Sequence, residues 1–162
     1  MPNITSQVQL QFLMNSVVAE VLDEVTEQLL RKLEDFIHQV VYNPYDPVKY
    51  DRLYFEGGLA GAWNQNVAKS FGNYVESSIE YNPSKLDIDI EQFQHGSLLS
   101  DGYTDIRESL VEIITEGKSG NLFGDGFWRQ PRDFWSPFIE YFETNARPML
   151  IKAFAEKGLK VI

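Results

Sequence analysis

The chain has 162 residues, of which 43% are hydrophobic and 23% are charged, and these proportions exclude a disordered chain and fit one globular domain. It contains no cysteine, which excludes disulfides and thiolate metal sites. The net charge of −10 disfavours nucleic acid as a tight partner, because that affinity depends on Lys and Arg neutralising phosphates. Neither a signal peptide nor a run of ~20 apolar residues is found, so we expect cytoplasmic synthesis and no membrane contact.

A long N-terminal helix is the clearest predicted element, beginning at Ser6 or Ser16 and ending near Val41. Apolar residues recur along it at steps of three and four residues: Val18, Leu22, Val25, Leu29, Leu33, Phe36 and Val40. Leu30, Ile37 and Val41 widen this stripe to the face expected of a helix packed on a core. Their mean spacing of about 3.67 residues fits a straight helix packed on its own globule better than a left-handed coiled coil. The helix is expected to end before Asn43-Pro44, because a following proline disfavours helical geometry. Residues 1–15 are a candidate flexible arm.

Strands are predicted in the middle of the chain. Residues 74–81 are rich in Val, Ile, Ser and Tyr, and residues 86–90 alternate strictly between apolar and acidic side chains. The intervening residues 82–85 indicate a turn, so the two segments predict a hairpin with one buried face. Residues 48–55 are expected to be extended, and residues 67–71 are a candidate third strand.

The remaining segments predict helices. Thr104 is expected to cap a helix that ends at Gly117, and residues 117–130 are expected to form a mobile or interface loop, because four glycines lie in its first ten residues. Ser136-Pro137 is expected to open another helix, and Pro148 to divide the C-terminal region into two helices. The second of these is expected to close at Lys157-Gly158.

This order of elements predicts an α+β fold. A long N-terminal helix packs on a small antiparallel sheet and is followed by C-terminal helices. We expect residues 1–162 to form a single domain.

No set of residues predicts a reaction centre, so we expect no catalytic activity, no cofactor and no metal. Gly117-Lys118-Ser119 is similar to the end of a phosphate-binding loop, but Glu112 stands where the motif requires its first glycine. His38 and His95 are too few for a histidine zinc site, and His38 is expected to pack beside the apolar stripe. Carboxylate pairs for hydrolysis stay open, since any acidic chain contains candidates.

Two segments carry a resemblance to a known family. Residues 45–54 followed by Gly57-Gly58-Leu59 are similar to the Tyr-Arg-x-x-Gly-x-Leu segment that follows the first helix of siphophage neck proteins, also labelled tail-completion or head–tail joining proteins. Residues 113–117, a glycine-rich gap and residues 131–138 resemble the same family's Glu-x-Gly and Pro-Arg-x-Phe segments. With the N-terminal helix, the resemblance spans about residues 15–160.

The resemblance implies a small α+β protomer that forms a ring, sixfold or twelvefold, between the portal and the tail. The implied partners are other copies of the chain, portal or adaptor proteins, and tail-tube or tail-terminator proteins. DNA would at most pass through the lumen, and the implied location is the neck or tail of the virion.

An aromatic cluster near the glycine-rich gap is the predicted subunit interface, because so many rings in one loop are hard to bury within one chain. The candidate interface residues are Phe123, Phe127, Trp128, Arg132, Phe134, Trp135 and Phe138. These residues could instead cover the chain's own sheet, and the sequence leaves both options open.

Three other functions stay open at the level of sequence. A tail-terminator ring that caps the tail tube has a protomer of similar size and topology. A small acidic hydrolase would need a pocket with perturbed carboxyl pKa values. An acidic adaptor would bind a basic partner with strong salt dependence.

Overall fold

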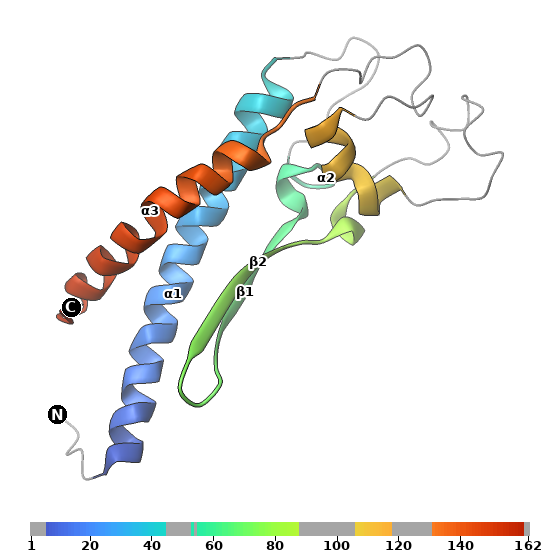
Figure 1. Ribbon diagram of the computed structural model, residues 1–162. Helices are drawn as coiled ribbons and strands as arrows, with labels where there is room; N and C mark the ends of the chain where they lie inside the picture. Colours follow the sequence, from blue (N-terminus) through green and yellow to red (C-terminus); the bar gives the residue numbers. More distant parts are fainter. Residues whose placement is uncertain (1–5, 45–52, 54, 88–105, 118–130, 161–162) are drawn as a thin grey trace, which may run out of the picture. The chain divides into compact units, whose positions relative to one another are not determined.

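The computed structural model describes residues 6–44, 53, 55–87, 106–117 and 131–160 (Figure 1). Its elements, in chain order, are α1 (Gln7–Ile37), a π-helical turn (His38–Tyr42), a 3-10 turn (Ala60–Ala62), β1 (Trp63–Ser70), β2 (Val75–Tyr81), a 3-10 turn (Pro83–Lys85), α2 (Ile106–Glu116) and α3 (Trp135–Glu156). The predicted α+β class is confirmed, with a long N-terminal helix, a two-stranded antiparallel sheet and C-terminal helices. Among the helices that the structure describes, none combines the length and the apolar character that a membrane span requires.

The chain divides into two compact units. The helix–hairpin unit contains the chain up to Lys32, the β1–β2 hairpin from Asn64 to Glu80, and the chain from Glu140 onward. The aromatic unit contains residues 33–63 and 81–139. The prediction of one domain with a flexible arm at residues 1–15 stays a prediction, although α1 already begins at Gln7.

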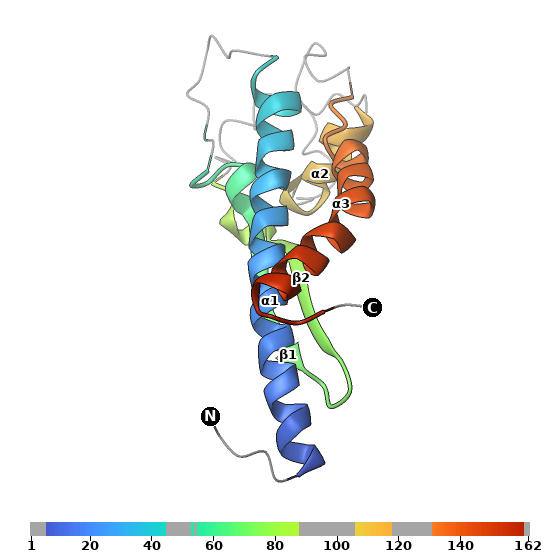
Figure 2. The same cartoon turned by 90° about the vertical axis from the view of Figure 1, so that its left-hand side faces the viewer.

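The core of the helix–hairpin unit lies where α1 meets the C-terminal half of α3. Val21, Val25 and Leu29 of α1 are buried against Ala153 of α3, and Ile79 of β2 packs on the same cluster. The two ribbon views show α1 running alongside both the hairpin and this part of α3 (Figures 1 and 2). Burial of this apolar stripe supplies the driving force that holds the two helices together.

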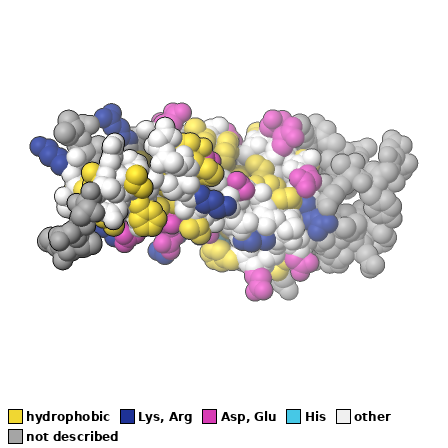
Figure 3. Space-filling model, turned by 90° about the horizontal axis from the view of Figure 1, so that it is seen from below, with side chains coloured by type: hydrophobic (Ala, Val, Ile, Leu, Met, Phe, Trp, Pro, Cys, Tyr) yellow, Lys and Arg dark blue, Asp and Glu magenta, His cyan; other side chains and the backbone are white. Residues whose placement is uncertain are grey.

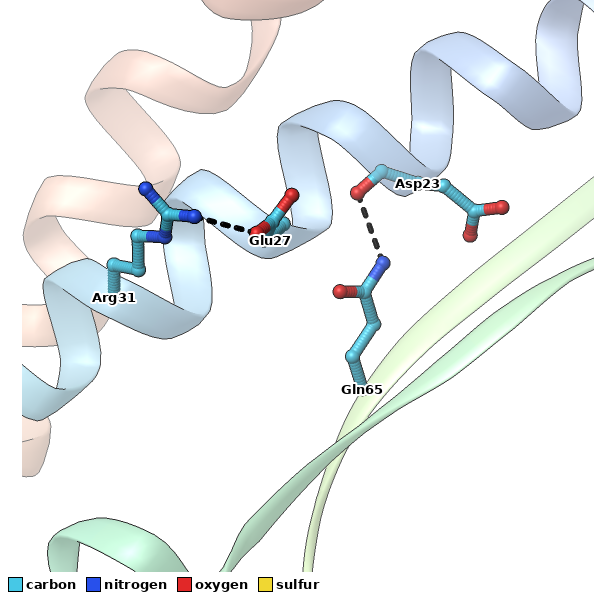
Figure 4. Close-up of polar contacts among 4 residues, drawn as sticks. All are labelled: Asp23, Glu27, Arg31 and Gln65. Atoms are coloured by element: carbon cyan, nitrogen blue, oxygen red, sulfur yellow. Dashed lines mark hydrogen bonds and ion pairs between the residues drawn. The ribbon is translucent and has the colours of Figure 1, made fainter. Parts of the chain in front are cut away.

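Polar contacts fix the hairpin on α1 at two levels. The Ala68 N–H donates to Oδ1 of Asp23 at 2.7 Å. Figure 4 shows the second contact, in which Nε2 of Gln65 donates to the Asp23 carbonyl oxygen at 2.8 Å. One turn of α1 thus supplies two acceptors to β1. Near the hairpin turn, Nδ2 of Asn15 donates to Ser70 Oγ at 2.7 Å and to the Gly72 carbonyl at 2.9 Å.

The aromatic unit encloses a second core. The apolar residues that it buries are Leu33, Ile37, Val41, Tyr42, Leu59, Ala60, Ala62, Trp63, Leu86, Ile113, Ile114, Phe134 and Phe138. Within the π-helical turn, the His38 ring packs edge-on against Tyr42 with centroids 5.0 Å apart, and it also contacts Phe55. The predicted packing role of His38 therefore agrees with the structure.

Hydrogen bonds to backbone groups connect the segments of this unit. The hydroxyl of Tyr42 accepts the Ala60 N–H at 3.1 Å. Arg132 donates two hydrogen bonds. Its backbone N–H donates to the Ile114 carbonyl at 2.8 Å, and its Nη1 donates to the Val41 carbonyl at 3.2 Å. Arg132 thus ties the segment before α3 to both α2 and the π-helical turn that follows α1.

The hairpin prediction is wrong in its pairing. β2 is a strand, as predicted for residues 74–81, but it pairs with β1, which includes most of the candidate third strand. Residues 82–85 turn the chain, and Leu86 then forms a parallel bridge with Gly57 instead of an antiparallel ladder with β2. Residues 88–90 lie outside the described residues, as does most of the predicted extended segment 48–55.

The C-terminal helix differs from its prediction in two ways. Pro148 lies inside one continuous helix, α3, and does not divide the region. The helix begins before Ser136, and its cap is Asp133, whose Oδ1 accepts the N–H groups of Trp135 at 3.0 Å and Ser136 at 2.9 Å. The predicted ends at Gly117 and Gly158 are confirmed, since Gly117 follows the last residue of α2, Gly158 lies two residues after the last residue of α3, and both have positive φ.

The Asp133 cap predicts a pH-dependent contribution to stability. Hydrogen bonds from the Ser136 hydroxyl, then from the Ser136 and Trp135 backbone, hold the pKa of Asp133 below its ordinary value of 3.8. Because the folded-state pKa is depressed, the stabilisation is fully present above pH 3.8 and is lost as the pH falls through the folded-state pKa.

Replacing Asp133 by Ala should therefore lower the free energy of unfolding by about 1 kcal/mol at pH 7. Urea unfolding at several pH values should show this loss shrinking below about pH 4. Asp133→Asn is the matched control, because it keeps a capping oxygen without titrating. A loss that is the same at pH 3 and pH 7 would contradict the assignment.

Candidate subunit interface

The structure separates the predicted interface residues. Phe123, Phe127 and Trp128 lie outside the described residues, and the other four belong to the aromatic unit. Phe134 is 0% exposed and Phe138 is 4% exposed, so both fill the core of their own unit. Trp135 keeps 36% of its surface exposed, and Arg132 is half-buried. Of these four, Trp135 is the aromatic residue that is available to a partner.

Trp135 is held by a stack of rings. Its indole lies on that of Trp63, with ring centroids 5.4 Å apart and an interplanar angle of 14°. The 93% buried Trp63 ring is itself flanked by Tyr81, with centroids 5.2 Å apart, and by Phe134, with centroids 6.5 Å apart. Asp133 fixes the Trp135 backbone at the start of α3. A large ring held in one orientation loses little entropy on binding, which suits an anchor in an interface.

The segments that carry the family resemblance have structural roles in the same unit. Leu59 is buried, and Gly57, at φ +75°, bridges to Leu86. Gly117, at φ +63°, ends α2 so close to the segment 131–134 that a Cβ there would lie 2.5 Å from the Pro131 nitrogen. Gly57 and Gly117 allow two backbone segments to come close together, because they have no Cβ. Leu59 and Phe134 are buried and pack in the core of the unit.

A second exposed apolar surface was missed by reasoning from sequence. It lies at the N-terminal end of α1 and at the hairpin turn of the helix–hairpin unit. Its members are Val8, Leu10, Phe12, Leu13, Met14, Phe71 and Tyr74. In the space-filling view from this side, hydrophobic side chains reach the surface of this unit (Figure 3). The sequence contained an indication of this surface, because no charged residue occurs before Glu20.

Along α1, the charged residues begin at Glu20, beyond the apolar residues of this surface. The Lys157 ammonium forms an ion pair with the Glu20 carboxylate, and this hydrogen bond raises the pKa of Lys157 above its ordinary value. The Glu20 side chain is mostly exposed and that of Lys157 keeps about a third of its surface in solvent, so the pair contributes little to stability. Its position marks the boundary between the uncharged end of α1 and the charged surface that follows.

The sequence of this chain matches the model of a known protein family. The model of the YomN family matches residues 5–160, nearly the whole chain. The chain belongs to the YomN family. YomN is a protein of a Bacillus phage region, and the chain is accordingly phage-associated. The chain matches no curated protein and no solved structure at a significant level.

The YomN match covers both units, including the Trp63–Trp135 stack and the exposed end of α1. The resemblance to siphophage neck proteins thus holds at the level of phage association. Among the residues that the structure describes, no three His, Cys, Asp or Glu side chains gather as metal ligands would.

Proposed function

We propose that this YomN-family protein is a non-enzymatic structural part of a phage particle, made in the host cytoplasm and built into the virion as a ring at the head–tail joint. The observation that carries the proposal is the family match over residues 5–160, which associates the chain with phage. The resemblance of residues 45–59 and 113–138 to neck proteins supports the finer position. The expected neighbours are the portal or adaptor proteins on one side and the tail proteins on the other.

Exposed rings on a rigid base support an assembly role. Interfaces depend on a few aromatic anchors that are already in place before binding. Trp135 meets this description, because the buried Trp63 ring supports one of its faces. The net charge of −10 suits a ring around a DNA channel, since an acidic lumen would not retain the DNA that passes through it.

The position in the particle is tested by imaging. A reconstruction of the assembled phage should place a ring of this chain between the portal and the tail, in sixfold or twelvefold symmetry. Density at the distal end of the neck, directly on the tail tube, would favour the tail-terminator alternative. A particle that lacks the chain would overturn the proposal and favour an enzyme or an acidic adaptor.

The aromatic interface is tested by mutation. We expect Trp128→Ala and Trp135→Ala to weaken ring assembly by at least tenfold, while the protomer stays folded. Assembly would be followed by sedimentation and folding by circular dichroism. Trp135→Phe is the matched control, because it keeps an aromatic ring on Trp63. Unchanged assembly in both alanine variants would remove these residues from the interface.

A further inference from the structure

The N-terminal end of α1 differs in chemistry from the rest of the chain. Acidic residues are absent before Glu20 and basic residues before Arg31, although 23% of the chain is charged. The exposed polar side chains of its first three turns are amides and one hydroxyl, from Gln7, Gln9, Gln11 and Ser16. Two chains of net charge −10 repel each other at most contacts, and this end is a surface where that repulsion is weakest.

Apolar residues occupy two opposite sides of this helical end. Val8 and Phe12, one turn apart, are 78% and 73% exposed. Leu10, Leu13 and Met14 are 47%, 37% and 39% exposed. At 3.6 residues per turn, the centres of these two groups lie roughly 170° apart around the helix axis. We call them the phenylalanine face and the leucine face.

The hairpin turn extends the phenylalanine face. Asn15 follows Val8 and Phe12 on the same side of α1, seven residues after Val8. Its amide donates to Ser70 and to Gly72, which places the turn on that side of the helix. Phe71 and Tyr74 stack at this turn with centroids 5.2 Å apart, and both are about half exposed. One side of the surface is therefore aromatic and the other is aliphatic.

A helix with one apolar face can pack against one partner, whereas a helix with two opposite apolar faces can pack against two. When the two faces differ, docking one on the other repeats in the same direction from copy to copy, which is the head-to-tail contact from which rings are built. We propose that the phenylalanine face of one copy docks on the leucine face of the next copy, so that the uncharged ends of α1 join neighbouring protomers. This inference rests on the homo-oligomeric role proposed above and names the contact that would produce it.

A lipid surface fits this end of the helix less well. Helices that lie on membranes carry Lys or Arg on their polar face, and the first thirty residues of this chain contain neither. The two opposed apolar faces are also wrong for a lipid surface, because such a helix buries one side and keeps the other in water.

The test uses one charge-introducing variant on each face of the full-length chain. Phe12→Glu alters the phenylalanine face, Leu10→Glu alters the leucine face, and Gln9→Glu adds the same charge between them. All three positions are exposed, so circular dichroism should show unchanged helicity. Sedimentation should show that the wild type and Gln9→Glu oligomerise, whereas each face variant alone is at least a hundredfold weaker and runs as a monomer.

Mixing the two face variants identifies the direction of docking. The Phe12→Glu chain keeps its leucine face and the Leu10→Glu chain keeps its phenylalanine face, so an equimolar mixture should form heterodimers and nothing larger. Dimers formed by one face variant alone would overturn the inference, because they require like faces to pair.

The remaining outcomes separate this inference from the proposed function. Wild-type oligomers that persist in both face variants would overturn the docking contact and leave the ring proposal standing. A wild type that is monomeric in solution and in the particle would overturn both proposals. Wild-type binding to phosphatidylcholine vesicles that is lost in Phe12→Glu, without self-association, would assign the surface to lipid and overturn the inference.

Discussion

Replacing Phe134 by Ala is expected to lower the free energy of unfolding by about 3–5 kcal/mol, the usual cost of removing a fully buried ring. Phe134 is 0% exposed and packs edge-on against both Trp63 and Trp135, with centroids 6.5 Å apart in each pair. The truncation leaves a cavity that the surrounding rings cannot fill. A loss of this size is a large part of the total stability of a typical domain.

Denaturant unfolding followed by tryptophan fluorescence would measure this loss. Two of the three tryptophans of the chain lie in this cluster, so the signal reports directly on it. Trp135→Ala is the informative comparison, because it removes a stacked but partly exposed ring and should cost only about 1 kcal/mol. Equal losses in the two variants would mean that Trp135 contributes to the core as Phe134 does and is not an available anchor.

This contrast shows what the sequence could predict about the interface. Composition and spacing located the aromatic segment before α3, but they could not distinguish a ring that fills the core from a ring that faces a partner. Phe134 and Trp135 are adjacent, yet their exposed fractions are 0% and 36%. Both rings contact Trp63, with centroids 6.5 Å and 5.4 Å away, so the difference lies in how much of each ring the surrounding residues cover.

The long helix was predictable because its apolar periodicity, from Val18 to Val40, extends over about six turns, but its buried line was only partly predicted. The residues that are buried on it follow steps of four: Val21, Val25, Leu29, Leu33, Ile37 and Val41. The predicted line shares Val25, Leu29 and Leu33 with this set, and Ile37 and Val41 were among the residues expected to widen it, so Val21 is the member that was missed. Both flanks of the helix are apolar, so periodicity alone could not choose between them, and contacts with other elements decided the register.

The errors in β1 and α3 have physical causes. β1 is rich in Asn, Gln, Lys and Ser, so its strand propensity is low. It is held instead by pairing with β2 and by Asp23, whose carboxylate accepts the Ala68 N–H. Pro148 is tolerated inside α3 because it and Thr144, whose carbonyl loses its helical partner, both lie on the exposed side, where water can replace the hydrogen bond.

The glycines after α2 and α3 share a backbone conformation but differ in their surroundings. Replacing each by alanine is therefore expected to lower stability by different amounts, with the larger loss at Gly117. Gly117 has φ +63° and Gly158 has φ +77°, and each ends a helix. A Cβ at Gly158 would meet nothing within 4 Å, whereas a Cβ at Gly117 would lie 2.5 Å from the Pro131 nitrogen and 2.8 Å from its Cδ. Pro131 is held in place, since the next residue, Arg132, donates to the Ile114 carbonyl.

Gly158→Ala should therefore cost about 1 kcal/mol, the strain of a left-handed alanine. Gly117→Ala should cost roughly 3 kcal/mol or more, because the clash with backbone adds to the same strain. Thermal and urea unfolding would measure the free energy of unfolding of both variants. Because both sites have positive φ, the difference between their losses gives the cost of the clash with Pro131 alone. Equal losses would mean that the segment 131–134 can move away from α2, and the Glu-x-Gly and Pro-Arg-x-Phe segments would then lose their structural explanation. A larger loss at Gly117 would explain both segments as the two sides of one close backbone contact, which positions Phe134 in the core and Trp135 at the surface.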